Sequence, residues 1–337
     1  MARLKPPSPG VGRLVRILSA VVVLAGIALT VGAGPFIHGV ASISWPTIAA
    51  AVALTAVATV SAVWRWRTVA AGFGLELSWQ GAIAAYYRSQ FLNTVLPGGV
   101  VGDVHRAHRH GRRAGSLALA ARAVATERIA GQLVQLALVA VALCVLGLSS
   151  RLHALGWIVA GVGLLVVVAV GVIAAAQRGR RLIRRELGYL GGLFGDSARS
   201  IRVVASSVLV VASHATLFIV ACIASGVRAP LTELVALALI ALTAGALPIN
   251  IGGWGPREGA AASAFVAVGL GAGAGVAAST TFGVLATIAV LPGAVVLIVS
   301  RVAAARDVRR STTVPPQPVI PSLTQIPSLK EKEEVTA

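Results

Sequence analysis

The stretch at residues 93–106 reads NTVLPGGVVGDVHR and interrupts an otherwise apolar, helix-like run. Its proline removes a backbone hydrogen-bond donor, and its adjacent glycines remove side-chain bulk and stiffness, so one continuous helix cannot pass through it. Residues 247–258 read LPINIGGWGPRE and repeat the pattern of leucine and proline, then glycines, then an acid and an arginine close together. The sequence therefore predicts two broken helices with charges at each break.

The composition identifies the solvent around these helices. Of the 337 residues, 57% are hydrophobic and 12% are charged, whereas soluble proteins carry about 25% charged residues. Apolar runs recur that are long enough to cross a hydrocarbon core of about 30 Å. We expect an all-α, polytopic membrane helix bundle of about eight membrane segments, including broken or re-entrant half-helices in two pseudo-repeats.

Basic residues account for the formal net charge of +18, and they cluster between the apolar runs. This distribution follows the positive-inside rule and predicts a multi-pass membrane protein with both termini in the cytoplasm. The excess of arginine over lysine, with much alanine and glycine, hints at GC-rich coding, and a bacterial plasma membrane is the expected location. Anionic lipids attract the same clusters, so membrane lipid is the expected partner and nucleic acid is not. The sequence WRWR at 64–67 is interpreted as an interface anchor, with rings at headgroup depth and guanidinium groups reaching water.

Three regions follow from this pattern: a cytoplasmic N-terminal segment at 1–16, a membrane domain at 17–305, and a basic, then proline-rich tail at 306–337. The first apolar run, near 17–34, is longer than a signal-peptide core and is followed by further spans, so we expect it to remain uncleaved. Another span is expected near 154–176. The tail has no amphipathic period and is expected to be disordered and cytoplasmic.

The two breaks are expected to line an interior cavity. Backbone groups freed at membrane depth are tolerated only where protein or a water-filled cavity satisfies them. In transporters, paired breaks of this kind surround the substrate near the middle of the bilayer. Two ordinary loops with turn residues are the alternative interpretation. The residues expected to break the helices are Pro97, Gly98, Gly99, Pro248, Gly252, Gly253 and Gly255.

Ionisable residues near the breaks complete the predicted site. Such groups are expensive inside a membrane unless they are paired or hydrated, and they usually face the interior of a bundle. The planar fork of an arginine matches a phosphate with two hydrogen bonds, while carboxylates would hold the arginines or bind a cationic headgroup. The membrane interface is the alternative location for several of them. The predicted substrate-binding residues are Arg88, Asn93, Asp103, Arg106, Glu127, Arg128, Arg257 and Glu258.

Three segments resemble one known family. They read RSQFLNTVLPGGVVGDVHR at 88–106, TERIAGQLVQL at 126–136 and ALPINIGGWGPREGAAASAF at 246–265. Their order and spacing are similar to those of the flippase-like family built around the membrane region of lysylphosphatidylglycerol synthase. The resemblance implies a membrane domain of repeated, broken-helix construction that moves a polar-headed lipid between leaflets. The full synthase carries a cytosolic aminoacyl-transferase domain after this region, and no such domain follows in this sequence.

The function predicted from these features is translocation of a polar-headed lipid, anionic or aminoacylated, between leaflets, by a transporter rather than an enzyme. Two alternatives stay open: a membrane-embedded transferase, or its accessory subunit, acting on a lipid-linked sugar or phosphate, and a small-solute secondary transporter. A homo-oligomer or a lipid-modifying enzyme as partner also stays open. No cofactor or catalytic residue is expected, and His105, His108 and His110 form no complete set of metal ligands.

Overall fold

The computed structural model describes residues 29–96, 99–145, 194–247 and 254–313, with the isolated positions 25–26, 188–189 and 191. Several sequence predictions lie outside the described residues. They concern Pro97, Gly98, Pro248, Gly252 and Gly253, the span near 154–176, and most of the span near 17–34.

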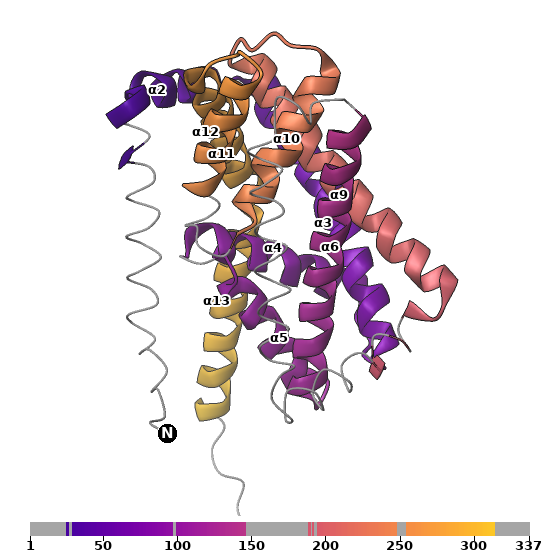
Figure 1. Cartoon of the computed structure of the whole chain (residues 1–337). Helices are drawn as coiled ribbons and strands as arrows, with labels where there is room; N and C mark the ends of the chain where they lie inside the picture. Colours follow the sequence, from indigo (N-terminus) through magenta and orange to yellow (C-terminus); the bar gives the residue numbers. More distant parts are fainter. Residues whose placement is uncertain are drawn as a thin grey trace, which may run out of the picture. The chain divides into compact units, whose positions relative to one another are not determined.

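The described residues form an all-helical structure, which confirms the predicted fold class (Figure 1). The helices are α2 (Gly34–Ala41), α3 (Trp45–Gly72), α4 (Trp79–Val95), α5 (Val101–Arg113), α6 (Leu117–Val145), α9 (Ser197–Ala224), α10 (Leu231–Gly245), α11 (Pro256–Ala267), α12 (Ala272–Ala289) and α13 (Pro292–Thr313). Contacts divide the chain into two compact units, Met1–Val296 and Leu297–Ala337. Helices α2 to α12 belong to the first unit.

Four stretches of the described residues are long and apolar enough to cross a membrane. They are Trp45–Gly72, Leu117–Cys144, Ser197–Ala224 and Ala272–Val302. Large apolar side chains on these helices, such as Ile129, Leu133 and Ile201, are exposed, as expected where lipid replaces water. The chain is therefore a membrane protein with several spans, while the total of eight segments and the two pseudo-repeats stay predictions.

The helix ends follow local sequence signals. Ser44 and Thr47 form a capping box at the start of α3, and the side chain of Asp196 accepts a hydrogen bond from the backbone N–H of Ala198 at the start of α9. Helix α4 ends at Val95, two residues before a proline, because the residue that precedes proline disfavours the helical conformation. Helix α11 begins at Pro256, whose missing N–H costs nothing in a first turn.

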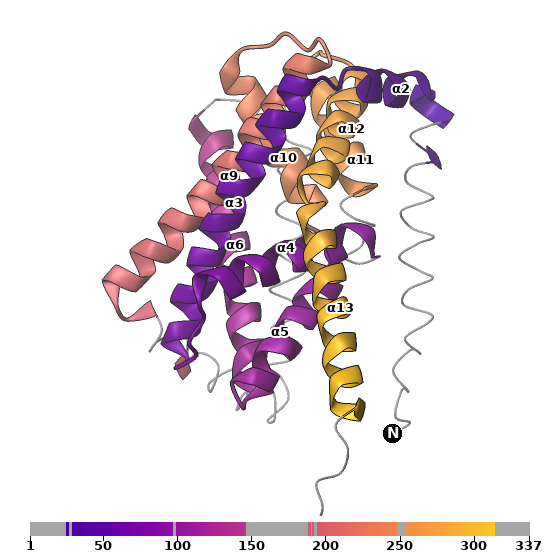
Figure 2. The same ribbon diagram turned by 180° about the vertical axis from the view of Figure 1, so that it is seen from behind.

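Helices α3 and α9 run side by side (Figures 1 and 2), and each also packs against α6 and α12. Around this pair lie two apolar clusters. One joins α9, α10, α11 and α12 through side chains that include Phe218, Leu237, Phe265 and Leu285. The other joins α3, α4, α6 and α9 through side chains that include Trp66, Val69, Tyr86 and Val203.

Candidate functional site

Both helix breaks line one cavity of about 910 Å³ inside the first unit. Gly99 and Val100 reach it from the segment between α4 and α5, and Ala246 and Leu247 reach it from the end of α10. Arg257, in the first turn of α11, lines it from beyond the second break. The breaks, which are far apart in the sequence, therefore meet at a shared interior space.

Asn93 and Asp103 fasten α4 to α5 across the first break. The side-chain oxygen of Asn93 accepts a 2.7 Å hydrogen bond from the backbone N–H of Gly102, and its nitrogen donates to Asp103 Oδ2 at 3.1 Å. The hydroxyl of Ser89 donates to Asp103 Oδ1 at 3.1 Å. A Cβ at Gly102 would lie 2.0 Å from the carbonyl oxygen of Ser89, so only glycine permits this approach of the two helices.

A buried network of ion pairs continues from Asp103 into the bundle. Arg106 Nη2 donates to Asp103 Oδ1 at 3.0 Å and to Glu127 Oε2 at 2.9 Å. Arg65 binds the other oxygen of Glu127 through Nε at 2.9 Å and Nη2 at 2.6 Å. Charges buried in this way persist only when they are paired and hydrogen-bonded. The network ties α3, α5 and α6 together through carboxylates.

Arg65 was not among the predicted site residues, and its position contradicts the interpretation of 64–67 as an interface anchor. Both Arg65 and Trp66 are buried. Arg67 donates to the carbonyl oxygen of Leu77 at 2.7 Å. The sequence WRWR is compatible both with an anchor at the membrane surface and with an ion pair inside a bundle. The burial of Arg65 shows that this arginine belongs to an ion pair inside the bundle.

Aromatic rings enclose the guanidinium group of Arg106. Its central carbon lies 4.4 Å from the ring centroid of Trp66 and 4.4 Å from that of Tyr86, a geometry in which the ring faces attract a cation. The ring of His110 packs edge-on against Trp66 at 5.8 Å. Burial, and then the charge of Arg113, lower the pKa of His110, which favours the neutral ring.

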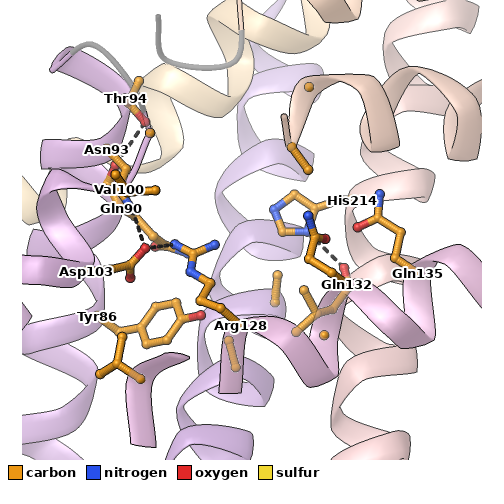
Figure 3. Close-up of a pocket in the computed structure, with 18 of the residues that line it drawn as sticks. Tyr86, Gln90, Asn93, Thr94, Val100, Asp103, Arg128, Gln132, Gln135 and His214 are labelled. Atoms are coloured by element: carbon orange, nitrogen blue, oxygen red, sulfur yellow. Dashed lines mark hydrogen bonds and ion pairs between the residues drawn. The ribbon is translucent and has the colours of Figure 1, made fainter. Parts of the chain in front are cut away.

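Arg128 is the accessible end of the network. Its Nη2 lies 2.6 Å from Asp103 Oδ2, yet 44% of its side chain is exposed, compared with 0% for Arg106 and Glu127. Its other terminal nitrogen points away from Asp103 into the cavity (Figure 3). With Arg65, the network holds three guanidinium groups against two carboxylates, and so it carries one uncompensated positive charge.

A second buried cluster lies beyond the second break. Glu258 Oε2 accepts a 2.6 Å hydrogen bond from the backbone N–H of Gly255. The carboxylate of Glu258 thereby caps the N-terminus of α11, the helix on which it lies. Glu258 Oε1 accepts from Arg257 at 2.7 Å and from the hydroxyl of Ser279 at 3.0 Å, and that hydroxyl in turn accepts from Arg257 Nε at 3.0 Å. This cluster is electrically balanced.

Gly283 on α12 makes room for Arg257. A Cβ at Gly283 would lie 2.3 Å from Arg257 Nη2 and 2.8 Å from the ring of Trp254. The guanidinium carbon of Arg257 lies 5.2 Å from the ring centroid of Trp254 and 5.1 Å from that of Phe282. Both break-associated arginines, one in each cluster, are thus held by a carboxylate and by aromatic faces.

The structure brings most of the predicted site residues together. Those that line the cavity are Asn93, Asp103, Arg128 and Arg257. Behind them, Arg106 binds Asp103, Glu258 binds Arg257, and Glu127 binds Arg106. Arg88 is buried but does not line the cavity, and its charged neighbours are Arg109 and Arg113. Of the three histidines considered for a metal, His108 lines the cavity and His110 packs against Trp66.

Sequence reasoning missed several polar residues of the cavity. Gln132 and Gln135 follow Arg128 at helical spacing on α6, and Gln135 Nε2 donates to Thr243 Oγ1 at 3.1 Å. His214 lines the cavity from α9, with one ring nitrogen 2.9 Å from a backbone carbonyl oxygen (Figure 3). The helical period of α6 and a histidine inside an apolar span were signals that could have found them.

Several spanning helices, built around an interior cavity with buried ion pairs, define a polytopic membrane protein. A sequence model of the family described as the lysylphosphatidylglycerol synthase TM region matches residues 16–293. The chain therefore belongs to this family, as the three segments predicted, and the match includes both breaks and every described residue of the cavity. No curated protein and no solved structure matches this chain.

Proposed function

We propose that this protein is an integral membrane translocase that moves a polar-headed lipid between the leaflets of the membrane. The observation that carries the proposal is that both helix breaks, with their arginine–carboxylate clusters, line one cavity inside a bundle of spanning helices. Charged groups are costly at membrane depth and usually face a substrate path. Membership of a family named for the membrane region of a lipid-modifying synthase supports a lipid substrate.

The size and lining of the cavity suit a headgroup rather than a whole lipid. Its volume of about 910 Å³ is at the upper end of the range of about 300–1,000 Å³ for small-molecule sites. Its lining combines polar side chains of α4, α5 and α6, such as Asn93, Asp103 and Gln132, with apolar ones of α9, α10 and α12, such as Val210, Leu242 and Phe282. A headgroup enters this space while the acyl chains stay in the surrounding lipid.

The breaks also supply the points at which the helices can reorient. Gly99 has a φ of 62° and Gly255 a φ of 100°, and residues other than glycine rarely adopt this backbone conformation. Both glycines directly adjoin half-helices that carry charges into the cavity, namely α5 and α11. Changes at a few such positions absorb the motion in hinge-type transitions. Alternating access by one predicted repeat moving against the other follows from this arrangement.

A cavity-blocking variant tests the proposed function. Ala125 lines the cavity on α6, whereas Leu133 is exposed on the same helix and is not among the lining residues. In liposomes with the purified protein, Ala125→Trp should reduce lipid movement between leaflets to the protein-free rate, while the matched control Leu133→Trp should keep it. Equal lipid movement in the two variants would contradict passage through the cavity.

The same liposomes separate this proposal from its two alternatives. Mass spectrometry of the recovered lipids detects a new lipid species if the protein is a transferase. Uptake of a water-soluble substrate that depends on a proton or sodium gradient indicates a small-solute transporter. Movement of headgroups without covalent change and without an imposed gradient supports the translocase.

A further inference from the structure

Beyond the general translocase, and resting on that proposed function, we propose that the cavity accepts a lipid headgroup with net negative charge. Arg128 binds its phosphate, and the site discriminates against cationic, aminoacylated headgroups. Three observations support this proposal. The carboxylates around the cavity are already fully hydrogen-bonded, the buried network carries one excess positive charge, and polar side chains line the cavity along α6.

Asp103, the acid that lines the cavity in the described part of the chain, is already fully hydrogen-bonded. Its Oδ1 accepts from Ser89 and from Arg106, and its Oδ2 accepts from Asn93 and lies 2.6 Å from Arg128. Four donors match the acceptor capacity of a carboxylate. An ammonium group of a headgroup would therefore have to displace one of these partners before it could bind.

The two acids behind the lining are occupied in the same way. Glu127 accepts from Arg65 and Tyr86 through Oε1 and from Arg106 through Oε2. Glu258 accepts from the cluster around Arg257 and from a backbone N–H. Both side chains are fully buried. Within the described residues, the cavity thus offers no carboxylate that is available to a cation.

Among the described residues, no carboxylate balances the excess positive charge of the network. Arg65, Arg106 and Arg128 face Asp103 and Glu127, which leaves one positive charge among the described residues of the network. An uncompensated charge inside a membrane protein is costly, so its counter-charge is expected from the ligand. A single phosphodiester carries this charge, and a guanidinium group binds it with charge-assisted hydrogen bonds.

Arg128 is the most exposed of the three arginines of the network and is positioned to make this contact. Its partly exposed guanidinium uses one terminal nitrogen for Asp103 and turns the other into the cavity (Figure 3). Arg65 also lines the cavity, but only 6% of its side chain is exposed, and Arg106 is fully buried. Arg106 binds Asp103, and Asp103 in turn holds Arg128 in place.

Gln132 and Gln135 extend the site along α6. They follow Arg128 at the fourth and seventh positions, on the same face of the helix, and both line the cavity. Seven residues of helix cover about 10 Å along its axis, at about 1.5 Å per residue. Amide side chains bind phosphate and hydroxyl groups without adding charge. They form a neutral track for a headgroup that leaves Arg128.

Direct binding tests the proposal independently of transport. The purified full-length protein is titrated calorimetrically with dihexanoyl lipids below their micelle concentration: phosphatidylglycerol (net −1), phosphatidylcholine (neutral) and lysylphosphatidylglycerol (net +1). We expect phosphatidylglycerol to bind at least about tenfold more tightly than the lysyl lipid. Equal or tighter binding of the cationic lipid would overturn the inferred headgroup class.

Variants assign the preference to Arg128. Arg128→Gln should weaken the binding of phosphatidylglycerol at least about tenfold, because a charge-assisted hydrogen bond is lost. Arg128→Lys should retain part of the preference for the anion. Arg112→Gln removes the same charge from an exposed position on α5 and should leave binding unchanged. An unaltered preference in Arg128→Gln, with the thermal unfolding temperature preserved, would reject Arg128 as the phosphate ligand.

Two further arms separate this inference from the proposed function. If liposomes move the cationic lipid as fast as the anionic one, the headgroup class is wrong and the translocase stands. If no lipid moves although phosphatidylglycerol binds preferentially, the translocase is wrong and the anionic site stands. Glycerol 3-phosphate carries the same phosphate without acyl chains. If it binds as tightly as the lipid, the ligand is a free phosphate compound and the lipid assignment falls.

Discussion

Arg65 and Glu127, 62 positions apart in the sequence, form a two-point ion pair with distances of 2.9 Å and 2.6 Å. The pair joins α3 to α6 in the interior of the bundle, where both side chains are buried. Because Arg106 binds the remaining oxygen of Glu127, one carboxylate holds two guanidinium groups in place. The loss of this carboxylate is therefore expected to lower the stability of the fold, whatever its effect on substrate binding.

Removing the charge of Glu127 should destabilise the protein strongly. Glu127→Ala leaves Arg65 and Arg106 buried without their shared counter-charge, and breaking a buried pair costs about 3–5 kcal/mol. We expect a large decrease in the thermal unfolding temperature in detergent, measured by intrinsic fluorescence. Glu76→Gln, at an exposed position between α3 and α4, is the control and should unfold like the original protein. Matching unfolding temperatures in the two variants would contradict the buried network.

The same reasoning applies to alanine at Arg106 or Glu258. From the sequence alone, either change is expected to abolish activity with the fold largely intact. Both side chains are fully buried in ion pairs, so alanine at either position tests folding and activity together. Arg128, at the accessible end, is the better probe of substrate binding.

Gly102→Ala should disturb the first helix break. The added Cβ would lie 2.0 Å from the carbonyl oxygen of Ser89, and backbone atoms cannot yield as a flexible side chain does. We expect α4 and α5 to separate, with loss of the hydrogen bond from Gly102 to Asn93 and of lipid movement in liposomes. Gly34→Ala, at a position with open space around the new Cβ, should retain full activity. Full activity in Gly102→Ala as well would show that this close approach is dispensable.

Ser279→Ala tests the second cluster with a small change. The hydroxyl accepts from Arg257 and donates to Glu258, each at 3.0 Å, and both bonds lie in the interior. The loss of one buried hydrogen-bonding group costs about 1–3 kcal/mol. We expect a lower unfolding temperature and slower lipid movement. Ser263→Ala, where an exposed hydroxyl donates to the carbonyl oxygen of Gly259 on its own helix, should change neither measurement.

Accessibility to a water-soluble thiol reagent should distinguish the two faces of α6. In a background with Cys144→Ser and Cys222→Ser, we expect a cysteine introduced by Gln132→Cys to react at least about tenfold faster than one introduced by Leu133→Cys, because a thiol reacts as a hydrated thiolate. Gln132 lines the cavity, whereas Leu133 is exposed on the surface of the spanning helix. Similar rates at both positions would mean that the cavity is not hydrated.

Local features explain which parts of the fold were predictable. Proline and glycine act on the chain within one or two residues, so the break after Val95 and the start of α11 at Pro256 follow from sequence. Asp103 and Glu127 were predicted because a charge inside an apolar run needs a partner. Arg106, a partner of Asp103, lies only three residues away, whereas Arg65 pairs with Glu127 across 62 positions, and nothing near Arg65 in the sequence indicates a carboxylate on α6.

Arg88 shows the limit of spacing arguments. It precedes Asn93 by five residues, and both were expected to face one cavity. At about 100° per residue, five positions place the side chains about 140° apart around the helix. Asn93 accordingly lines the cavity, while Arg88 lies near Arg109 and Arg113. Whether a residue of this helix faces the cavity thus depends on its angular position around the helix axis and not on its distance along the sequence.

The two neighbours Gln132 and Leu133 differ by about 100° around α6, and one lines the cavity while the other is exposed on a spanning helix. The polar lining of the cavity and the apolar surface of the protein consequently meet along the length of α6. In the proposed translocation, a lipid at this border keeps its acyl chains in the bilayer while its headgroup moves through the cavity. The proposed path therefore avoids the transfer of a whole lipid into water, which would expose its apolar chains.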